Sequence, residues 1–319
     1  MFFHAFSNPP QPFRYYIVAN HYNLNSMNIL QKIIKLQKTT RSLAQNWLTV
    51  TVKIYLLKKY PVTVKLKNKG FKYINDEGDW WAIKLLVEKF GSGYDVNTDT
   101  LNTTYNGTII VLKGASHSAA VEIFGDKIYE DLNVDGKDVL DIGGNIADSA
   151  ISFAIRGAKK IIGIEPYHVH YKFAIENIAL NKLTNHIIFL NGGAGKENSE
   201  LSIADWDNVN AASSIQQENN GIKINIYSLK HLVTQFNLVN PILKMDCEGC
   251  EYEIINEENI DVLRVFSEIF MEYHFGSVDL EKLLLKSGFS ILSITHDEPN
   301  YNPKAKQNMR TGLIHAKHI

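Results

Sequence analysis

The part of the chain after Asp138 alternates short apolar strands with helices, and this rhythm restricts the possible folds more than any other feature. Each apolar run is bounded by polar or turn-forming residues, and the segments between the runs have helical spacing. Strands are expected at 139–142, 160–165, 186–190, 223–226, 242–246, 265–271, 290–295 and 312–315, with helices at 148–155, 168–181, 252–257 and 280–286. Such alternation predicts an α/β fold with a doubly wound parallel sheet, whose ligands lie at the carboxyl ends of the strands.

The residues before this region predict two further parts. Residues 1–26 mix aromatic residues, asparagine and proline without a period, and we expect a poorly ordered lead-in. We therefore divide the chain into this lead-in, a basic N-terminal extension of helices and a hairpin (27–106), and a ligand-binding domain (107–319). The elements expected before residue 138 are a helical segment over 28–60, hairpin strands at 62–67 and 71–74, a helix near 80–90, and strands at 107–112 and 120–124.

Charge is divided unevenly along the chain. The first 75 residues contain twelve Lys or Arg and no Asp or Glu, although the whole chain has a net charge of -1. This division predicts a basic partner-binding segment attached to an acidic body. The open interpretations for residues 27–60 are packing on the body, binding to an anionic membrane surface and self-association. RNA is a further candidate partner of the basic segment, through its phosphates.

Composition and the cysteine count restrict the class of protein. With 45% hydrophobic and 21% charged residues, the chain has the composition of a globular protein. It has no run of about 18 apolar residues, and Met1-Phe-Phe-His lacks the basic start of a secretory signal, so we expect a cytoplasmic protein, or one at the inner membrane surface. Because no second pair is present for zinc, Cys247 and Cys250 are expected to be packed thiols in a reducing compartment.

The stretch from Val139 to Ser149 closes an apolar strand and opens a helix within one glycine turn. Glycine lets the backbone approach a ligand closely. Asp141 stands two residues before Gly143 and would repel a pyrophosphate, so the turn suits a positively charged ligand. S-adenosylmethionine carries an ammonium and a sulfonium and no phosphate, and its methionine end fits such a turn.

A second acidic residue ends the next strand. Glu165 lies 22 residues after Gly143, where a carboxylate can accept hydrogen bonds from both ribose hydroxyls. Asn191-Gly-Gly, after the third strand, could flank the adenine. A satisfied surface carboxylate is the alternative interpretation of Asp141 and of Glu165, but their paired spacing favours a cofactor site.

Four stretches of the sequence together resemble the motifs of a known family. They are Asp141-Ile-Gly-Gly-Asn-Ile-Ala-Asp-Ser149, Glu165-Pro166, Lys244-Met-Asp-Cys-Glu-Gly-Cys-Glu251 and Glu272-Tyr-His274. Over about residues 107–275 the chain resembles the FkbM-type S-adenosylmethionine-dependent methyltransferases. The resemblance implies a Rossmann-like methyltransferase sheet of seven strands, mostly parallel with one antiparallel strand, and S-adenosyl-L-methionine as the cofactor. It also implies methylation of hydroxyl oxygens, which in this family mostly belong to sugars and polyketide-like rings.

Two positions depart from the family pattern. Gly144 stands where alanine is usual, and Ala147 where glycine is usual. We expect the additional methyl group of Ala147 to weaken cofactor binding at most, because dinucleotide folds also tolerate alanine at the third glycine position. The expected cofactor-binding residues are Asp141, Gly143, Gly144, Asn145, Ser149, Glu165, Pro166, Gly192 and Asp246.

Methyl transfer is an in-line displacement, so the enzyme has to position a nucleophile and remove its proton. A histidine side chain ordinarily titrates near neutrality, so His274 is the expected base, while Asp246 orients it or contacts the substrate or the donor's ammonium. Lys244 is a third catalytic candidate. The alternative for His274 is a hydrogen-bonded structural histidine, and the alternative for Lys244 is a buried ion pair. Glu248 and Glu272 are expected at the substrate. A divalent cation held by Asp246, Glu248 and Glu272 would lower a hydroxyl's pKa, but the spacing is not diagnostic and we assign no metal ligand.

The sequence therefore predicts an S-adenosylmethionine-dependent O-methyltransferase that acts on a hydroxyl of a glycan, glycolipid or similar polyol. An RNA methyltransferase that uses the basic segment is one alternative. A catalytically degenerate binding module is the other, suggested by Ala147. The expected acceptor is a small molecule or glycan, and we assign its recognition to residues 196–221 and the N-terminal segment.

Overall fold

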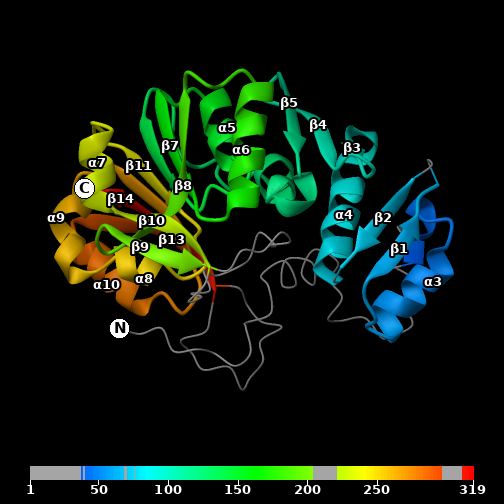
Figure 1. Ribbon diagram of the computed structural model, residues 1–319. Helices are drawn as coiled ribbons and strands as arrows, with labels where there is room; N and C mark the ends of the chain where they lie inside the picture. Colours follow the sequence, from blue (N-terminus) through cyan, green and yellow to red (C-terminus); the bar gives the residue numbers. More distant parts are fainter. Residues whose placement is uncertain (1–36, 39, 68–69, 76, 204–220, 297–310) are drawn as a thin grey trace. The chain divides into compact units, whose positions relative to one another are not determined.

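The computed structural model describes residues 37–38, 40–67, 70–75, 77–203, 221–296 and 311–319 (Figure 1). The chain forms two compact units, Met1–Glu88 and Lys89–Ile319. The boundary between the units lies before residue 106, where the N-terminal extension was expected to end. The strands that follow Lys89 belong to the second unit. The expected lead-in and most of the stretch assigned to acceptor recognition lie outside the described residues.

The first unit contains a helical segment and a hairpin. α3 (Trp47–Thr51) continues into the π-helical η2 (Val52–Leu56), and β1 (Val62–Lys65) pairs antiparallel with β2 (Phe71–Ile74). Buried valines alternate with exposed polar residues along β1, as in a strand with one packed face. The helix α4 spans Glu77–Phe90. The hairpin and this helix are confirmed. The expected helical segment before Pro61 is confirmed in part, because Ala44 forms a β-bridge with Leu66 and residues 57–60 are not helical.

Among the described residues, the second unit is built on a nine-stranded sheet (Figure 1). The strand order is β13-β14-β12-β11-β6-β7-β8-β10-β9. The seven strands from β13 to β8 form the expected sheet, in which β14 runs antiparallel to both neighbours and the other pairs are parallel. β10 and β9 extend the sheet beyond β8. The strands are β6 (Asp138–Ile142), β7 (Lys160–Glu165), β8 (Ile187–Gly195), β9 (Ser199–Ile203), β10 (Ile222–Ser228), β11 (Ile242–Met245), β12 (Glu268–Tyr273), β13 (Phe289–His296) and β14 (Gly312–His318).

Helices join these strands, as the alternation predicts. A helix at 229–235 was not expected; it begins at Ser228, whose hydroxyl accepts a hydrogen bond from the His231 amide at 3.2 Å. No helix in the described ranges is long and apolar enough to cross a bilayer. The helices are α5 (Asp148–Ile155), α6 (His168–Leu180), α7 (Leu229–Gln235), α8 (Glu251–Ile254), α9 (Ile260–Leu263) and α10 (Val278–Lys286).

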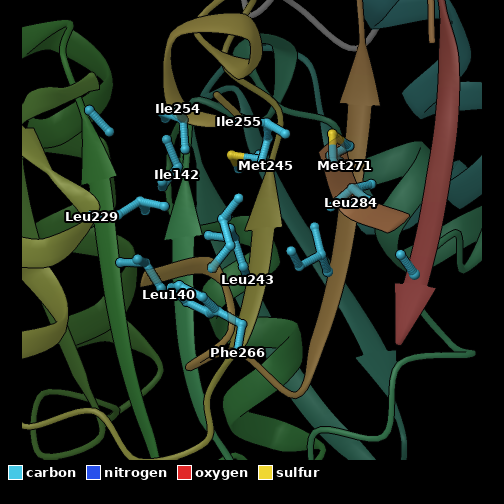
Figure 2. Close-up of a cluster of buried hydrophobic side chains, with 14 of the residues drawn as sticks. Leu140, Ile142, Leu229, Leu243, Met245, Ile254, Ile255, Phe266, Met271 and Leu284 are labelled. Atoms are coloured by element: carbon cyan, nitrogen blue, oxygen red, sulfur yellow. The ribbon is translucent and has the colours of Figure 1, made fainter. Parts of the chain in front are cut away.

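The central strands bury an aliphatic cluster on one face of the sheet, whereas the other face carries Asp141, Lys244 and Glu272 among further buried apolar side chains. Side chains alternate along a strand, so Leu243 and Met245 of β11 share a face, and Lys244 points to the opposite one. Each buried aliphatic side chain contributes roughly 1.5–3 kcal/mol to folding. Figure 2 shows the apolar cluster, which includes Leu140, Ile142, Leu229, Leu243, Met245, Ile254, Ile255, Phe266, Met271 and Leu284.

A smaller antiparallel sheet precedes the large one in the chain. It consists of β3 (Tyr94–Asp95), β4 (Thr100–Tyr105) and β5 (Thr108–Lys113). β5 was expected from the sequence and β4 was not. The strand expected at 120–124 is wrong, because Val121–Asp126 forms the π-helical η5. A short apolar run fits a helical turn as well as a strand, and here the Asp148 carboxylate accepts a hydrogen bond from the Ala119 amide just before the turn.

Two asparagine side chains of α6 bind the backbone of β5. The Asn181 amide accepts from Val111 N at 3.0 Å and donates to Val111 O at 2.7 Å. Asn177 does the same at Lys113, at 2.8 and 3.1 Å. Asn177 Nδ2 also donates to the Ile146 carbonyl at 3.1 Å, in the turn that follows β6. A buried side chain of α6 therefore ties the smaller sheet to the glycine turn.

Candidate functional site

The glycine turn after β6 is held by backbone contacts that only glycine allows. The amides of Gly143 and Gly144 both donate to the Ile164 carbonyl of β7, at 3.1 and 2.9 Å. Gly143 has a φ of +75°, and a Cβ at this position would lie 1.7 Å from the Asp246 carbonyl oxygen. The turn therefore packs directly on the end of β11, which brings Asp246 beside it.

The two departures from the family pattern have separate physical consequences. Ala147 is buried in the left-handed region with a φ of +66° at the start of α5, a conformation that costs an L-residue about 1–2 kcal/mol. It does not line the cavity described below, so its methyl group strains the backbone rather than the ligand site. At Gly144, a Cβ would lie 2.7 Å from the ring of Phe189. The Phe189 ring thus occupies the room that an alanine side chain would need.

Asp141 and Lys244 form a buried ion pair behind the turn. They are register partners on the neighbouring strands β6 and β11, and the carboxylate and Nζ lie 3.0 Å apart. Ser149 Oγ donates to Asp141 Oδ2 at 2.5 Å, and Lys244 Nζ donates to the Gly143 carbonyl at 2.9 Å. Burial alone would lower the pKa of Lys244, but the nearby Asp141 and Asp246 raise it above the usual value. The charge of Asp141 is therefore balanced within the protein, and Asp141 is not among the cavity residues.

Glu165, at the end of β7, closes the other side of the turn. Its carboxylate accepts hydrogen bonds from Asn145 N at 3.0 Å and from Tyr167 N at 2.9 Å. Asn191, the register partner of Glu165 on β8, donates to the carbonyls of Glu165 and Pro166 at 3.0 and 3.1 Å. These bonds hold the Glu165 carboxylate in the wall of the cavity.

The turn and the carboxyl ends of β7, β8 and β11 surround one cavity of about 770 Å³, counted with the solvent at its mouth. Most of the expected site residues line it. Those that line it are Gly143, Asn145, Ser149, Glu165, Pro166, Gly192, Lys244, Asp246 and Glu248. Those that do not are Asp141, Gly144, Glu272 and His274.

Two cavity residues could not be found by sequence reasoning. His170 lies on α6 with Nδ1 3.6 Å from Glu165 Oε1. Tyr129 lies before β6, beside Asp246; burial and neighbouring acids raise its pKa well above the usual value. Neither belongs to a recognisable motif. The one sequence signal for His170 was its position in the expected helix at 168–181, three residues after Tyr167.

Four carboxylates surround one imidazole beside the cavity, and we call this group the His274 cluster. His274 Nδ1 lies 3.1 Å from Glu251 Oε1, while Nε2 lies 3.3 Å from Glu248 Oε2 and 3.6 Å from Glu272 Oε1. Asp246 and Glu248 each place a carboxylate oxygen within 4.8 Å of a His274 nitrogen. Glu248 has a φ of +57° and precedes Gly249 at +122°, so the turn after β11 folds its side chain back toward His274.

The protonation of the His274 cluster follows from this arrangement. Burial alone would lower the pKa of His274, but Glu251, Glu248 and Glu272 outweigh it and raise the pKa well above the usual value. Burial raises the pKa of Glu248 to about 7 and that of Glu272 well above its usual value. Burial also raises the pKa of Asp246. The expected role of His274 as base stays a prediction; an imidazolium has no lone pair to accept a proton, so the geometry favours the cavity carboxylates in that role.

Cys247 and Cys250 are joined by a disulfide in the turn between β11 and α8. The expectation of two packed thiols is therefore wrong. The turn brings their Cα atoms to 5.6 Å, within the distance that a disulfide requires. Both residues line the cavity next to Asp246 and Glu248.

Comparison with known proteins agrees with the motifs. Residues 141–291 match the model of the methyltransferase FkbM domain. None of the curated proteins compared with the chain matches it.

Similar solved structures include Sp1610 of Streptococcus pneumoniae, a proposed tRNA (m1A22) methyltransferase, with 15% identity over 63% of this chain and 70% of that one and a TM-score of 0.40. The M. jannaschii tRNA m1G37 methyltransferase has 14% identity over 84% of this chain and 66% of that one, with a TM-score of 0.40. M. jannaschii TYW2, solved in complex with AdoMet, has 16% identity over 71% and 89%, with a TM-score of 0.37.

The domain match contains the glycine turn, Glu165 and the whole His274 cluster, so the resemblance inferred from the motifs is confirmed. The chain carries, over residues 141–291, an FkbM methyltransferase domain.

Proposed function

We propose that the protein is an S-adenosylmethionine-dependent O-methyltransferase that methylates a hydroxyl of a glycan, glycolipid or similar polyol. One observation carries the proposal. A single cavity is lined by Glu165, by the glycine turn and by Asp246 and Glu248. A cofactor that reaches from Glu165 to Asp246 would present its reactive end beside groups that can accept a proton.

The cavity residues fit S-adenosylmethionine on an independent point. Asn145 Oδ1 is buried and has no hydrogen-bond partner among the described residues, although Asn145 lines the cavity. A buried acceptor of this kind is costly unless a ligand supplies a donor. Glu165 would accept from the ribose hydroxyls, Gly143 would allow close approach of the backbone, and Asp246 would face the ammonium. The cofactor, when bound, supplies a methyl group on a positively charged sulfur.

The protein's own groups would then act on the acceptor. A sugar hydroxyl is a weak acid, so a carboxylate has to take its proton as the new bond forms. Asp246 and Glu248 line the cavity, and burial raises the pKa of each. Each carboxylate is therefore a stronger base than an ordinary one. Lys244 is engaged by Asp141 and by the Gly143 carbonyl; its role is to position the turn.

Binding of S-adenosylmethionine to the full chain, measured by titration calorimetry, tests the cofactor. Glu165→Gln keeps the shape of the side chain but removes its charge and one acceptor. Hydrogen bonds to a charged group contribute about 1.5–3 kcal/mol, so we expect the affinity to fall by at least about tenfold. Glu268→Gln is the matched control, because Glu268 is buried at the other end of the sheet, where it pairs with His315 at 2.6 Å. No binding by the wild type, or equal affinity of both variants, would remove the basis of the proposal.

A labelled-methyl transfer assay identifies the acceptor class. Glycan, lipid and RNA fractions of the source cells are incubated separately with the protein and the labelled cofactor. We expect the label in the glycan or glycolipid fraction and its loss with Asp246→Asn. Label in RNA alone would support the RNA methyltransferase alternative, for which the basic segment is the motive.

A further inference from the structure

We propose that Asp246, Glu248 and His274 form a binding site for a divalent cation of the first transition row, with Mn²⁺ as the representative ion. The site lies in the wall of the cavity, since Asp246 and Glu248 line it. Ion binding is independent of the proposed acceptor and can be measured without cofactor or substrate.

The three donor groups are already gathered around one point. One ligand atom from each, two carboxylate oxygens and an imidazole nitrogen, lies within 4.8 Å of the others. Donors about 2.1 Å from a common ion lie about 3–4.2 Å from one another. Side-chain movements of about 1–2 Å or less therefore bring the three donors to the spacing that an ion requires.

Two buried atoms at this point have no hydrogen-bond partner among the described residues. They are His274 Nε2 and Glu272 Oε1, and both residues are 7% exposed. Nε2 is also the nitrogen that faces Glu248 Oε2, at 3.3 Å, and Glu272 Oε1, at 3.6 Å. Buried polar atoms are normally satisfied, so unsatisfied atoms that converge on one place indicate a missing ligand.

The other nitrogen of the same ring is held in the way that metal-binding histidines are held. His274 Nδ1 lies 3.1 Å from Glu251 Oε1, and Glu251 Oε1 also accepts from the Cys247 amide at 3.2 Å. With Nδ1–H donating to this fixed carboxylate, an ion that displaces the proton of Nε2 is bound by the Nε2 lone pair between Asp246 and Glu248. A carboxylate behind the imidazole sets the ring orientation and raises its basicity as a metal ligand.

Charge points to a cation as well. The His274 cluster places four carboxylates around one imidazole, and Lys244, which lies near Asp246, is paired with Asp141. Buried carboxylates without compensating charge are costly. A divalent ion compensates two of them. The imidazole nitrogen favours Mn²⁺, Co²⁺ or Zn²⁺ over Mg²⁺ and Ca²⁺, which prefer oxygen donors alone.

The position of the site gives the ion a role in the proposed function, and this step rests on that function. An ion at Asp246 and Glu248 has open coordination positions toward the cavity. Two adjacent hydroxyls of a polyol can fill such positions, and an ion lowers the pKa of a hydroxyl bound to it. A polyol with neighbouring hydroxyls is thus the acceptor class that fits the site.

Binding of Mn²⁺ alone to the chelator-treated full chain is the direct test. Electron paramagnetic resonance measures the free ion, and we expect saturable binding of one ion per chain. Glu248→Gln, His274→Gln and the positioning variant Glu251→Gln should each weaken binding by at least about tenfold. Glu253→Gln is the matched control, since Glu253 is exposed on α8, two residues after Glu251, and should leave the affinity unchanged.

A second measurement needs no variant. Bound Mn²⁺ should broaden the ring resonances of His274 beyond detection while those of His186, which precedes β8 at the opposite end of the sheet, persist. Co²⁺ should give a visible absorption band. Absence of saturable binding, a His274 signal that persists with Mn²⁺, or equal affinities of E248Q and E253Q would overturn the site. Loss of cofactor binding in E165Q with intact Mn²⁺ binding separates the two proposals.

Discussion

Gly143 is the position where one added carbon should disturb the site most. A Cβ there would lie 1.7 Å from the Asp246 carbonyl oxygen, at a φ of +75°. Gly107, in the turn between β4 and β5, is a matched control with a φ of +77°, and its Cβ would meet nothing within 4 Å. Both alanine variants carry the same backbone strain, and only Gly143→Ala adds the clash.

The expected magnitudes follow from these contacts. Alanine in the left-handed region costs about 1–2 kcal/mol, and the stiffer unfolded chain returns about 0.4–1 kcal/mol, so Gly107→Ala should cost about 1 kcal/mol. In Gly143→Ala the turn and β11 have to separate by roughly 2 Å to reach an ordinary contact distance. That movement breaks the bond from Asp246 N to Ile142 O, now 3.0 Å, and a lost buried hydrogen bond costs about 1–3 kcal/mol. We expect a total loss of about 2–4 kcal/mol.

Urea unfolding of the full chain, followed by circular dichroism, measures both variants. The slopes should match the wild type, so that the shift of the midpoint reports the change in unfolding free energy. S-adenosylmethionine affinity, measured in parallel, should fall for G143A and stay unchanged for G107A. Equal loss of stability in G143A and G107A would refute the contact between the turn and β11.

Three further predictions use the same unfolding assay or its extensions. Lys244→Met should lower the free energy of unfolding by about 3–5 kcal/mol, because it leaves the buried Asp141 carboxylate unpaired. Adding Asp141→Asn should restore most of this loss. A double variant that recovers no stability would contradict the pairing. Burial raises the pKa of Asp148 to about 6, so the folded protein holds the carboxyl proton more tightly than the unfolded chain does. The stability that this group contributes is therefore lost as pH rises from about 4 to about 6. Asp148→Asn should flatten that part of the profile of unfolding free energy against pH, and an unchanged profile would count against the shift. Asn177→Leu should speed hydrogen exchange of the Lys113 amide by at least about tenfold, whereas unchanged exchange would show that the side chain does not protect it.

The order of elements in the second unit could be predicted because it depends on local patterns. Apolar runs and helical spacing alternate from Asp138 onward, and α5 and β7 have the bounds that the spacing indicates. Residues 121–126 failed, because a short apolar run has no period of its own and neighbouring side chains decide its conformation. β10 was expected as a strand and β9 was not, and no local signal records that β10 pairs with β8 and β9 with β10.

The site could be predicted as a set of residues but not as a set of contacts. Motif spacing placed Glu165 and Asp246 at strand ends, where both line the cavity. The spacing did not reveal that Asp141 faces Lys244, about a hundred residues away, because that depends on the register of β6 and β11. Nor did it reveal how three glutamates surround His274. The balance of charge depends on how the chain folds. The residue types alone therefore do not decide whether these side chains act as a general base or bind a cation.

The asparagine pair on α6 gives that helix the role of a neighbouring strand. Four residues of helix rise about 6 Å, close to the 6.4–6.8 Å covered by two residues of a strand, so Asn177 and Asn181 meet Lys113 and Val111 in register. Their amides occupy the hydrogen-bonding groups that β5 would otherwise offer to another chain. An unpaired edge strand is a template for aggregation. Removing both amides would therefore turn β5 into a site where copies of this protein add strand to strand.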